Sequence, residues 1–209
     1  MRIEEVGDKT FIYMIKDALS KEECEKIINL YDNNEEYQLE GITGGGLNLD
    51  LKKTKDINLP NMIRRHHLES MNIDNILFSS LNKGLKALKE AIGNSNISML
   101  MKAENWFAHD DGYLIQVYSK DGYYHWHNDE NMTYNGVHRQ VTALWYLNDV
   151  PEENGGATEF LKQGVSITPT AGTLIFFPSF WTHIHRACEL LDGKKYIATT
   201  WVGIDRSGT

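Results

Sequence analysis

Two stretches in the N-terminal half of the chain carry apolar residues at helical spacing. The first opens with Ser20-x-x-Glu23, a capping-box pattern that predicts the start of a helix. Its apolar face consists of Cys24, Ile27, Ile28 and Tyr31. The second runs from about Asp74 to Ala91, and Gly93 is placed to end it. Its apolar stripe consists of Ile76, Leu77, Leu81, Leu85, Leu88 and Ile92.

The pattern changes after Ser98 to short apolar runs separated by Gly, Asp and Asn. The runs that predict strands are Met99–Ala108, Tyr113–Tyr118, Val141–Leu147, Thr158–Leu161, Gly172–Phe177, His183–Glu189 and Tyr196–Val202, together with Thr10–Ile15 near the N-terminus. Many short strands at this spacing are typical of a sandwich or jelly roll. We therefore expect a mainly β fold with flanking helices, in which the N-terminal helices pack on one sheet.

Residues 33–60 show neither a helical nor a strand period. They are polar and contain Gly44-Gly45-Gly46, so we expect a long mobile loop, or a hairpin, that covers a site. A phosphate-binding loop is disfavoured because no Gly-Lys-Ser/Thr sequence follows the glycines. The expected organisation is one structural unit, in which residues 1–97 form a strand and helix support and residues 98–209 form the β core.

Composition narrows the class of protein. The 209 residues suit one domain, and a hydrophobic share of 41% is enough for a core. The net charge of −8 argues against nucleic acid or an acidic membrane as the partner, because those surfaces attract basic proteins. Only Lys52-Lys53-Thr54-Lys55 could form a local basic patch.

Cysteine usage and hydropathy bear on the compartment. Cys24 and Cys188 lie far apart and no Cys-x-x-Cys occurs, which excludes a disulfide scaffold or a zinc ribbon. The N-terminus is acidic, and no apolar run is long enough to span a membrane. We expect a cytoplasmic protein without a membrane partner. The sequence gives no indication of its oligomeric state.

The strongest chemical signal lies in Tyr123-Tyr124-His125-Trp126-His127-Asn128-Asp129. Residues two apart on a strand project to the same side, so His127 and Asp129 can converge on one metal ion. A third ligand is available in Thr182-His183-Ile184-His185-Arg186. Two histidines and one carboxylate with open coordination positions form the facial triad of non-haem Fe(II) oxygenases.

Other ligand sets remain open at this point. His125 shares the parity of His127, so His125, His127 and His185 could instead bind zinc. Glu130 is adjacent to Asp129 and could replace it as the oxygen ligand, although the two-residue period favours Asp129. His183 shares the parity of His185, and only one of these two need bind the metal.

Spacing to a basic residue favours His185 over His183. Lys195 lies ten residues beyond His185, with a turn signal at Asp192-Gly193 between them. A hairpin at that turn can bring His185 and Lys195 into one pocket. An exposed strand edge is the simpler interpretation of Lys194-Lys195. The apolar residues that follow Lys195 nevertheless suggest a strand that faces the core.

These motifs together resemble the Fe(II)/2-oxoglutarate-dependent dioxygenases, and among them the prolyl 4-hydroxylase-like group. The resemblance extends from about Phe11 to Trp201. It is carried by Ala18-Leu19-Ser20-x-x-Glu23-Cys24, Tyr118 to Asp129, Arg139-x-x-Thr142-x-x-x-Tyr146-Leu147-Asn148-Asp149-Val150, Gly155-Gly156-x-Thr158-x-Phe160, Gly172-x-Leu174-Ile175-Phe176-Phe177-Pro178, His185 and Gly193-x-Lys195-Tyr196. One departure is Glu189, where the family usually has a proline after the distal histidine.

The resemblance implies a double-stranded β-helix, also called a jelly-roll or cupin-like fold, that holds Fe(II) through His127, Asp129 and His185. It further implies 2-oxoglutarate as cosubstrate and O₂ as oxidant, and it allows L-ascorbate as an additional cofactor. Lys195 would bind the distal carboxylate of 2-oxoglutarate. The other residues expected around the cosubstrate are Tyr118, Thr142 and Tyr124.

The implied reaction is hydroxylation of an unactivated C–H bond, with a prolyl residue of a peptide or protein as the first candidate substrate. Two other functions compete with it. The first is a jelly-roll module that binds a ligand without catalysis, which would tolerate loss of the ligand set. The second is a zinc-dependent hydrolase that uses the His125, His127 and His185 cluster, which would have no use for Lys195.

Overall fold

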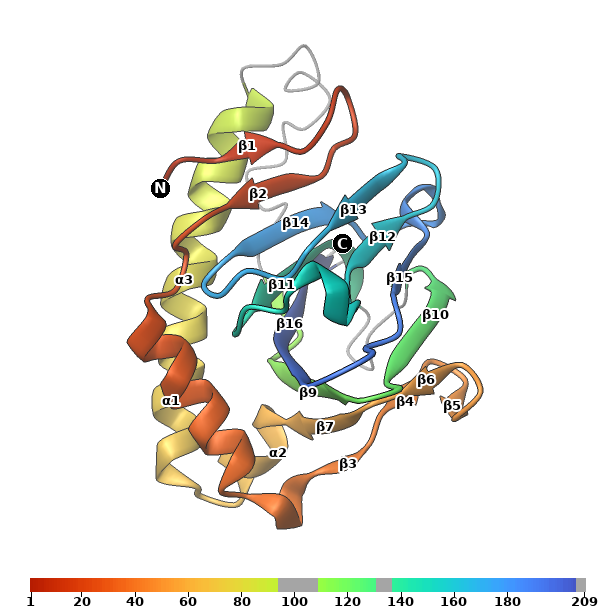
Figure 1. The fold of residues 1–209 in the computed structure, drawn as a ribbon. Coiled ribbons are helices and arrows are strands. Elements are labelled where there is room, and N and C mark those ends of the chain that lie inside the picture. Colours follow the sequence, from red (N-terminus) through yellow and green to blue (C-terminus); the bar gives the residue numbers. More distant parts are fainter. Residues whose placement is uncertain (94–108, 131–136, 206–209) are drawn as a thin grey trace.

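The computed structural model describes residues 1–93, 109–130 and 137–205, and Figure 1 shows its helices on one side of a curved β structure. The three α-helices within these ranges are α1 (Lys21–Asp32), α2 (Leu59–Arg64) and α3 (Leu68–Gly93). Short 3₁₀ turns occur at η1 (Glu35–Tyr37), η3 (Glu152–Asn154) and η4 (Trp181–His183).

The two long helices form where the apolar patterns predicted them. Ser20 caps α1, and both hydrogen bonds of the capping box with Glu23 are present. Helix α3 begins at Leu68 rather than Asp74, because Ser70 at its start donates its backbone N–H to His67 Nδ1 at 3.2 Å. Gly93 is the last described residue of α3.

A large sheet forms the layer against the helices. Its strands pair in the order β1-β2-β14-β11-β16-β9-β7-β3, and β8 also pairs with β16. Their bounds are β1 (Glu4–Glu5), β2 (Tyr13–Ile15), β3 (Leu39–Glu40), β7 (Lys55–Asn58), β8 (His109–Asp110), β9 (Leu114–Ser119), β11 (Val137–Tyr146), β14 (Leu174–Pro178) and β16 (Lys194–Asp205). Every pairing described in this sheet is antiparallel.

A smaller sheet lies across from it, with the strand order β13-β12-β15-β10-β6. Its strands are β6 (Lys52–Lys53), β10 (Tyr123–His127), β12 (Thr158–Phe160), β13 (Val165–Ile167) and β15 (His185–Ala187). A separate hairpin joins β4 (Ile42–Thr43) to β5 (Gly46–Leu47). Two facing antiparallel sheets are the arrangement of a jelly roll, as the strand pattern predicted.

The alternation of side chains along the large sheet produces two cores. One face packs on the helices through residues such as Val117, Ala143, Trp145, Leu174, Phe176 and Ala198. The other face packs on the small sheet through residues such as Leu144, Tyr146, Ile175, Phe177 and Ile197. Helix α3 lies so close to β14 that a Cβ atom on Gly84 would meet Phe176 at 2.9 Å. The large sheet is therefore buried on both faces, by the helices on one side and by the small sheet on the other.

Residues 33–60 were expected to form a long mobile loop or a hairpin; a hairpin is present, but the segment also contributes strands to both sheets. This segment contains β3 and β7 of the large sheet, β6 of the small sheet and the β4–β5 hairpin. Its polar sequence hid the strands because β6 and β7 bury charged side chains, Lys52 and Asp56, where an alternating pattern needs apolar ones. Lys52 is therefore not part of a surface basic patch.

Other predicted boundaries shifted. The strand expected over Thr10–Ile15 is confined to β2, because Thr10 is hydrogen-bonded to Val6 in the preceding turn. The run His183–Glu189 divides into η4 and the shorter β15. The expected strand Met99–Ala108 lies outside the described residues.

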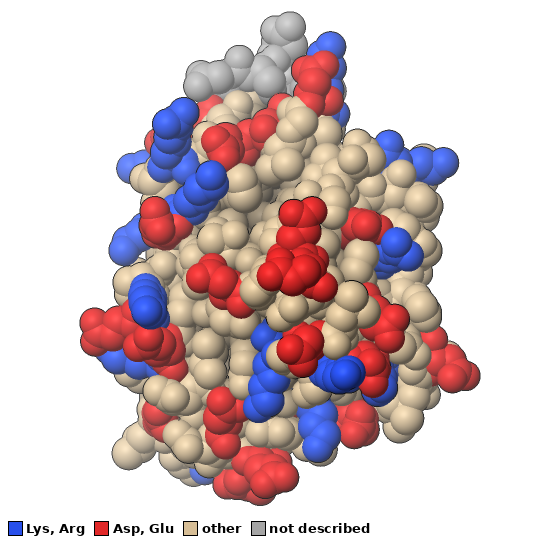
Figure 2. Space-filling view, viewed as in Figure 1, with Lys and Arg blue, Asp and Glu red and all other residues tan. Residues whose placement is uncertain are grey.

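Figure 2 shows Asp and Glu side chains spread among Lys and Arg over one face, in keeping with the acidic composition.

Candidate metal and cosubstrate site

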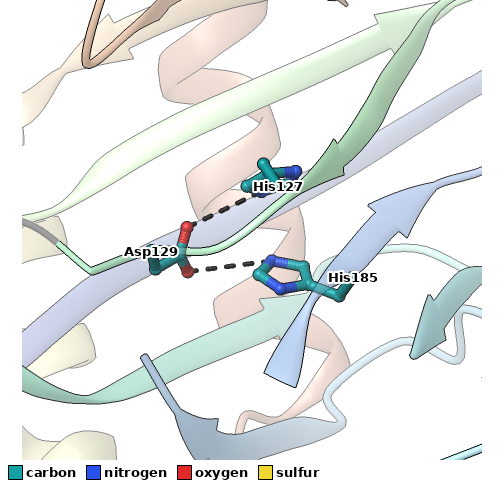
Figure 3. A group of neighbouring side chains, drawn as sticks. All are labelled: His127, Asp129 and His185. Carbon is teal, nitrogen blue, oxygen red and sulfur yellow. Dashed lines mark ion pairs between the residues drawn. The ribbon is translucent and has the colours of Figure 1, made fainter. Parts of the chain in front are cut away.

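Three potential metal ligands converge between the two sheets, as Figure 3 shows. His127 ends β10, Asp129 follows that strand by two residues, and His185 begins β15. Their ligand atoms all lie within 4.8 Å of one another. Asp129 Oδ1 is 3.6 Å from His127 Nε2, and Asp129 Oδ2 is 3.8 Å from His185 Nε2. Among the described residues this is the only such group of His, Cys, Asp and Glu.

Backbone carbonyls orient both imidazoles toward the centre of the group. His127 Nδ1 lies 2.7 Å from the His125 carbonyl oxygen, and His185 Nδ1 lies 3.0 Å from that of His183. A carbonyl can only accept, so each Nδ1 carries the proton and each Nε2 presents a lone pair. Burial, reinforced by His185, lowers the pKa of His127 to about 3, which keeps its imidazole neutral, the form that binds a metal.

Asp129 is held as an ionised, oriented carboxylate. Burial by itself would raise its pKa, but His185, His127 and the Thr142 hydroxyl outweigh that effect, and the pKa lies below its usual value. Thr142 Oγ1 donates to Asp129 Oδ2 at 2.8 Å, and the backbone N–H of Asp129 donates to the Ser179 carbonyl at 3.1 Å. These contacts fix Asp129 beyond the end of β10, where strand geometry no longer positions it.

A cavity of about 510 Å³ opens beside the three ligands. The side chains of Lys195, Ile197, Thr199 and Trp201, at alternate positions of β16, line one wall. A register shift in the β11–β16 pairing lies between Arg139 and Val141. Because of this shift, Arg139 lines the same cavity as Thr142, although strict alternation would place them on opposite faces.

Lys195 is buried in the cavity wall without a carboxylate partner among the described residues. It is 1% exposed, its Nζ donates to the Gly156 carbonyl at 2.6 Å, and its ammonium lies 4.8 Å from the centroid of the Tyr118 ring. Burial lowers the pKa of Lys195 to about 7. A buried cation with one neutral acceptor is well suited to receive the carboxylate of a ligand.

Tyr146 was missed by sequence reasoning and lies beside Lys195. Lys195 Nζ is 5.8 Å from the centroid of its ring, and its buried hydroxyl has no hydrogen-bond partner by distance and angle among the described residues. Tyr146 shares the parity of Thr142 and Leu144 on β11, so the two-residue period could have identified it. Its hydroxyl can donate to the same ligand carboxylate.

The other expected cosubstrate residues occupy different places around the cavity. The Tyr118 ring faces Lys195, whereas the Tyr124 ring is stacked on His127 with centroids 3.5 Å apart and planes at 12°. Thr142 lines the cavity, but its hydroxyl is bonded to Asp129 and to Ser179 Oγ at 3.0 Å. Tyr124 and Thr142 therefore contact the metal ligands rather than Lys195.

The competing ligands do not join the group. His125 is exposed, and its ring packs on Tyr123 with centroids 4.6 Å apart. A register irregularity between Tyr124 and His127 breaks the alternation of β10, so His125 and His127 do not share a face. His183 is buried elsewhere, with Nε2 2.8 Å from the Thr10 carbonyl. Glu130 lines the cavity but lies outside the three-residue group.

Comparison with known proteins gives a family match in this region. Residues 113–203 match the model of the 2OG-Fe(II) oxygenase superfamily. Prolyl 4-hydroxylase 1 of Arabidopsis thaliana is 28% identical over 219 aligned residues, which cover 91% of this chain and 68% of that protein. The alpha-1 subunit of prolyl 4-hydroxylase from Gallus gallus is 38% identical over 71 residues, covering 31% of this chain and only 13% of that subunit.

Solved structures with a similar fold cover nearly the whole chain. A prolyl hydroxylase from Trichoplax adhaerens, in complex with a hypoxia inducible factor peptide fragment, aligns with a TM-score of 0.70 and 19% identity over 94% of this chain and 84% of that one. The viral collagen prolyl hydroxylase of Paramecium Bursaria Chlorella virus-1 aligns with a TM-score of 0.62 and 19% identity over 95% and 98% of the two chains. These alignments confirm the predicted fold class.

Proposed function

We propose a prolyl residue of a peptide or protein as the substrate of this chain, which is a 2OG-Fe(II) oxygenase of the prolyl 4-hydroxylase-like type. The predicted family, the enzyme class and the requirement for Fe(II), 2-oxoglutarate and O₂ are confirmed by these matches. The single observation that carries the site assignment is the convergence of His127, Asp129 and His185 beside a buried lysine in one cavity. A role for L-ascorbate stays a prediction.

The side chains present fit the iron that the family requires. Two neutral imidazoles and an ionised carboxylate, grouped on one side of an open cavity, form the donor set that suits non-haem Fe(II). In this proposal His127, Asp129 and His185 hold the metal. With 2-oxoglutarate and O₂ bound, the iron supplies the oxidation of an unactivated C–H bond.

The chain's own residues would bind and orient the cosubstrate. Lys195 would bind its distal carboxylate by a charge-assisted hydrogen bond, which gains strength where water is excluded. Tyr146 would donate a second hydrogen bond to that carboxylate, and the Tyr118 ring would close the wall behind Lys195. These contacts would fix the cosubstrate in one orientation relative to the three ligands.

The outer part of the cavity provides a place for a polypeptide. Ile42, Thr43 and Gly44 of the β4–β5 hairpin line it on one side, and Arg64 at the end of α2 lines it on another. Arg139 lies in the same wall, paired with Asp111 at 2.7 Å and stacked 3.7 Å over the Trp201 ring. Apolar and hydrogen-bonding groups around one open cavity suit an extended peptide chain. A peptide substrate is supported by the relatives named above.

The two competing functions are less well supported. A zinc hydrolase would need His125 as a ligand, but that side chain is exposed and packs on Tyr123 instead. A module that only binds ligands would not need the hydrogen bonds that orient His127, Asp129 and His185. No α-helix among the described residues is both long and apolar enough to cross a membrane. The predicted absence of a nucleic-acid partner and the predicted location stay predictions.

Anaerobic titration of the Fe(II) protein with 2-oxoglutarate tests the ligand assignment. We expect a visible charge-transfer band that is lost in Asp129→Ala and His185→Ala. The band should persist in the matched controls His125→Ala and His183→Ala, whose side chains lie outside the ligand group. A band that survives in Asp129→Ala, or disappears in His125→Ala, would contradict the proposed ligands.

The substrate is tested by turnover on peptides. We expect peptides that contain proline to gain the mass of one oxygen atom per succinate produced, and matched peptides with alanine at that position to gain none. Oxygen incorporation into the alanine peptides, or into neither set while succinate is still produced, would contradict a prolyl substrate. That outcome would leave the oxygenase assignment in place.

A further inference from the structure

A second buried lysine, Lys52, lies in the cavity wall and has no part in the function proposed above. It is 2% exposed, and its Nζ forms an ion pair with Asp56 Oδ2 at 2.7 Å. The two residues belong to different sheets, since Lys52 is in β6 and Asp56 is in β7. Removing two charges from water is costly, and an apolar pair of similar size is often at least as stable. Stability therefore gives no sufficient reason for an ion pair at this place.

The ion pair contacts the metal site through Tyr124. Lys52 and Tyr124 are directly opposite each other in the β6–β10 pairing, and Lys52 Nζ lies 5.2 Å from the centroid of the Tyr124 ring. The same ring is stacked on the imidazole of His127, at 3.5 Å between centroids. A cation near an aromatic ring restrains it. The sequence of contacts thus runs from Asp56 to Lys52, from Lys52 to Tyr124, and from Tyr124 to His127.

The backbone at Gly41 closes over the ion pair from the side of the hairpin. A Cβ atom at this position would lie 2.8 Å from Lys52 Cε and 3.1 Å from Asp56 Oδ2. It would also overlap with Thr54 Oγ1. Gly41 immediately precedes the β4–β5 hairpin and donates its N–H to the Thr54 carbonyl at 2.9 Å. The space around the ion pair is therefore filled, and the ammonium of Lys52 is held in one position.

We propose that Lys52 is a positioning residue for the metal centre: Asp56 holds its ammonium against the Tyr124 ring, and that ring in turn sets the orientation of the His127 imidazole. The proposal rests on the function proposed above, because it takes His127 as a metal ligand. Contacts that orient a ligand from outside the metal's own coordination shell typically change metal affinity or activity by about 10- to 100-fold when removed. An effect of that size is expected here, without direct contact between Lys52 and the cosubstrate.

The test compares Lys52→Met with the double variant Lys52→Met/Asp56→Leu. The single variant leaves a buried carboxylate without its cation, so its melting temperature should fall. The double variant replaces both charges by apolar groups and should recover the melting temperature. We expect both variants to bind Fe(II) roughly 10- to 100-fold more weakly under anaerobic conditions. We also expect a lower kcat for consumption of 2-oxoglutarate, with its KM nearly unchanged.

A second measurement follows His127 without any metal. The ¹⁵N and ¹H signals of its imidazole in the metal-free protein should shift in the double variant, since the ring packed on it is no longer held. A double variant with wild-type stability, wild-type Fe(II) affinity and unshifted His127 signals would overturn the proposal. Failure of the proposed function would give a different result. The wild-type protein would then bind no Fe(II), whereas the His127 signals of the metal-free protein would still report the position of the ring.

Substitution of Gly41 disturbs the same ion pair without changing its charges. Gly41→Ala should displace the Lys52 side chain and shift the His127 signals in the same direction as the double variant. Gly45→Ala is the matched control in the same hairpin, because its Cβ atom would meet only Thr43 Oγ1, at 3.7 Å. Equal His127 signals in Gly41→Ala and Gly45→Ala would contradict a role for the ion pair in orienting His127.

Discussion

Two lysines are buried in the wall of the same cavity, but their surroundings differ. Lys52 is 2% exposed and forms an ion pair with Asp56, whereas Lys195 is 1% exposed and donates to a backbone carbonyl. Each lies near a tyrosine ring, Tyr124 for Lys52 and Tyr118 for Lys195. The difference lies in the counter-charge: the protein supplies one to Lys52, while Lys195 has none among the described residues.

The charge of Lys52 is therefore neutralised within the protein, whereas the charge of Lys195 is available to a ligand. A buried charge that is already neutralised gains little from an incoming anion, so Lys52 is poorly suited to bind the cosubstrate. A buried charge without a partner destabilises the empty protein and recovers that energy when a carboxylate binds. The same residue type therefore has opposite consequences for stability and for binding at the two positions.

The largest expected effect is on stability, in Lys52→Met. Breaking a buried pair by removing one partner typically costs about 3–5 kcal/mol, because the remaining charge is left uncompensated. Burial already raises the pKa of Asp56, and loss of Lys52 would raise it further. Chemical denaturation of the metal-free protein measures this loss.

The corresponding substitution at Lys195 should have the opposite sign on stability. Lys195→Met removes a charge that has no ionic partner within the described part of the chain, so the metal-free protein should be as stable as the wild type, or more so. Equal destabilisation by the two substitutions would remove the distinction between the lysines.

The second effect concerns cosubstrate binding by Lys195. Hydrogen bonds to charged groups contribute about 1.5–3 kcal/mol, so Lys195→Met should raise the dissociation constant of 2-oxoglutarate roughly 10- to 100-fold. The matched control is Lys194→Met, the neighbouring lysine, which is half exposed and pairs with Asp32 at 3.4 Å. Anaerobic titration measures both. An unchanged constant in Lys195→Met would mean that another group binds the carboxylate.

The smallest expected effect is the pH dependence of that same binding step. Burial lowers the pKa of Lys195 to about 7, and a bound carboxylate raises it again because it stabilises the ammonium. Affinity for 2-oxoglutarate should therefore be constant below about pH 7 and lower by up to about tenfold at about pH 8. Lys195→Arg stays charged and should remove this dependence. A wild-type affinity that is flat from pH 6 to 9 would contradict the assignment.

Much of the candidate site could be predicted from residue type and spacing. His127, Asp129, His185 and Lys195 are polar or charged residues within apolar or aromatic surroundings, which is unusual for surface positions. Their order along the chain resembles one family, and the structure brings all four to one cavity. Tyr146 carried the same two-residue signal as Thr142, but tyrosine is common in strands and the signal was not distinctive.

Strict alternation failed where strands are irregular. On β10 it predicted that His125 would accompany His127, but the irregularity between Tyr124 and His127 brings Tyr124 to the cavity and leaves His125 exposed. On β11 the register shift near Arg139 brings this side chain into the cavity that Thr142 also lines. A bulge inserts one residue into the alternation, and the sequence carries no mark of its position.

The sequence by itself indicated the class of fold, the resemblance to one family and the residues proposed to bind iron and a carboxylate, because each depends on residue types in a recognisable order along the chain. Only the tertiary structure decided how these residues are held. Lys52 and Asp56 pair across strands of different sheets, and Lys52 meets the Tyr124 ring across the β6–β10 pairing. The energy of a buried charge depends on what surrounds it in space, and chain-distant strands supply those surroundings.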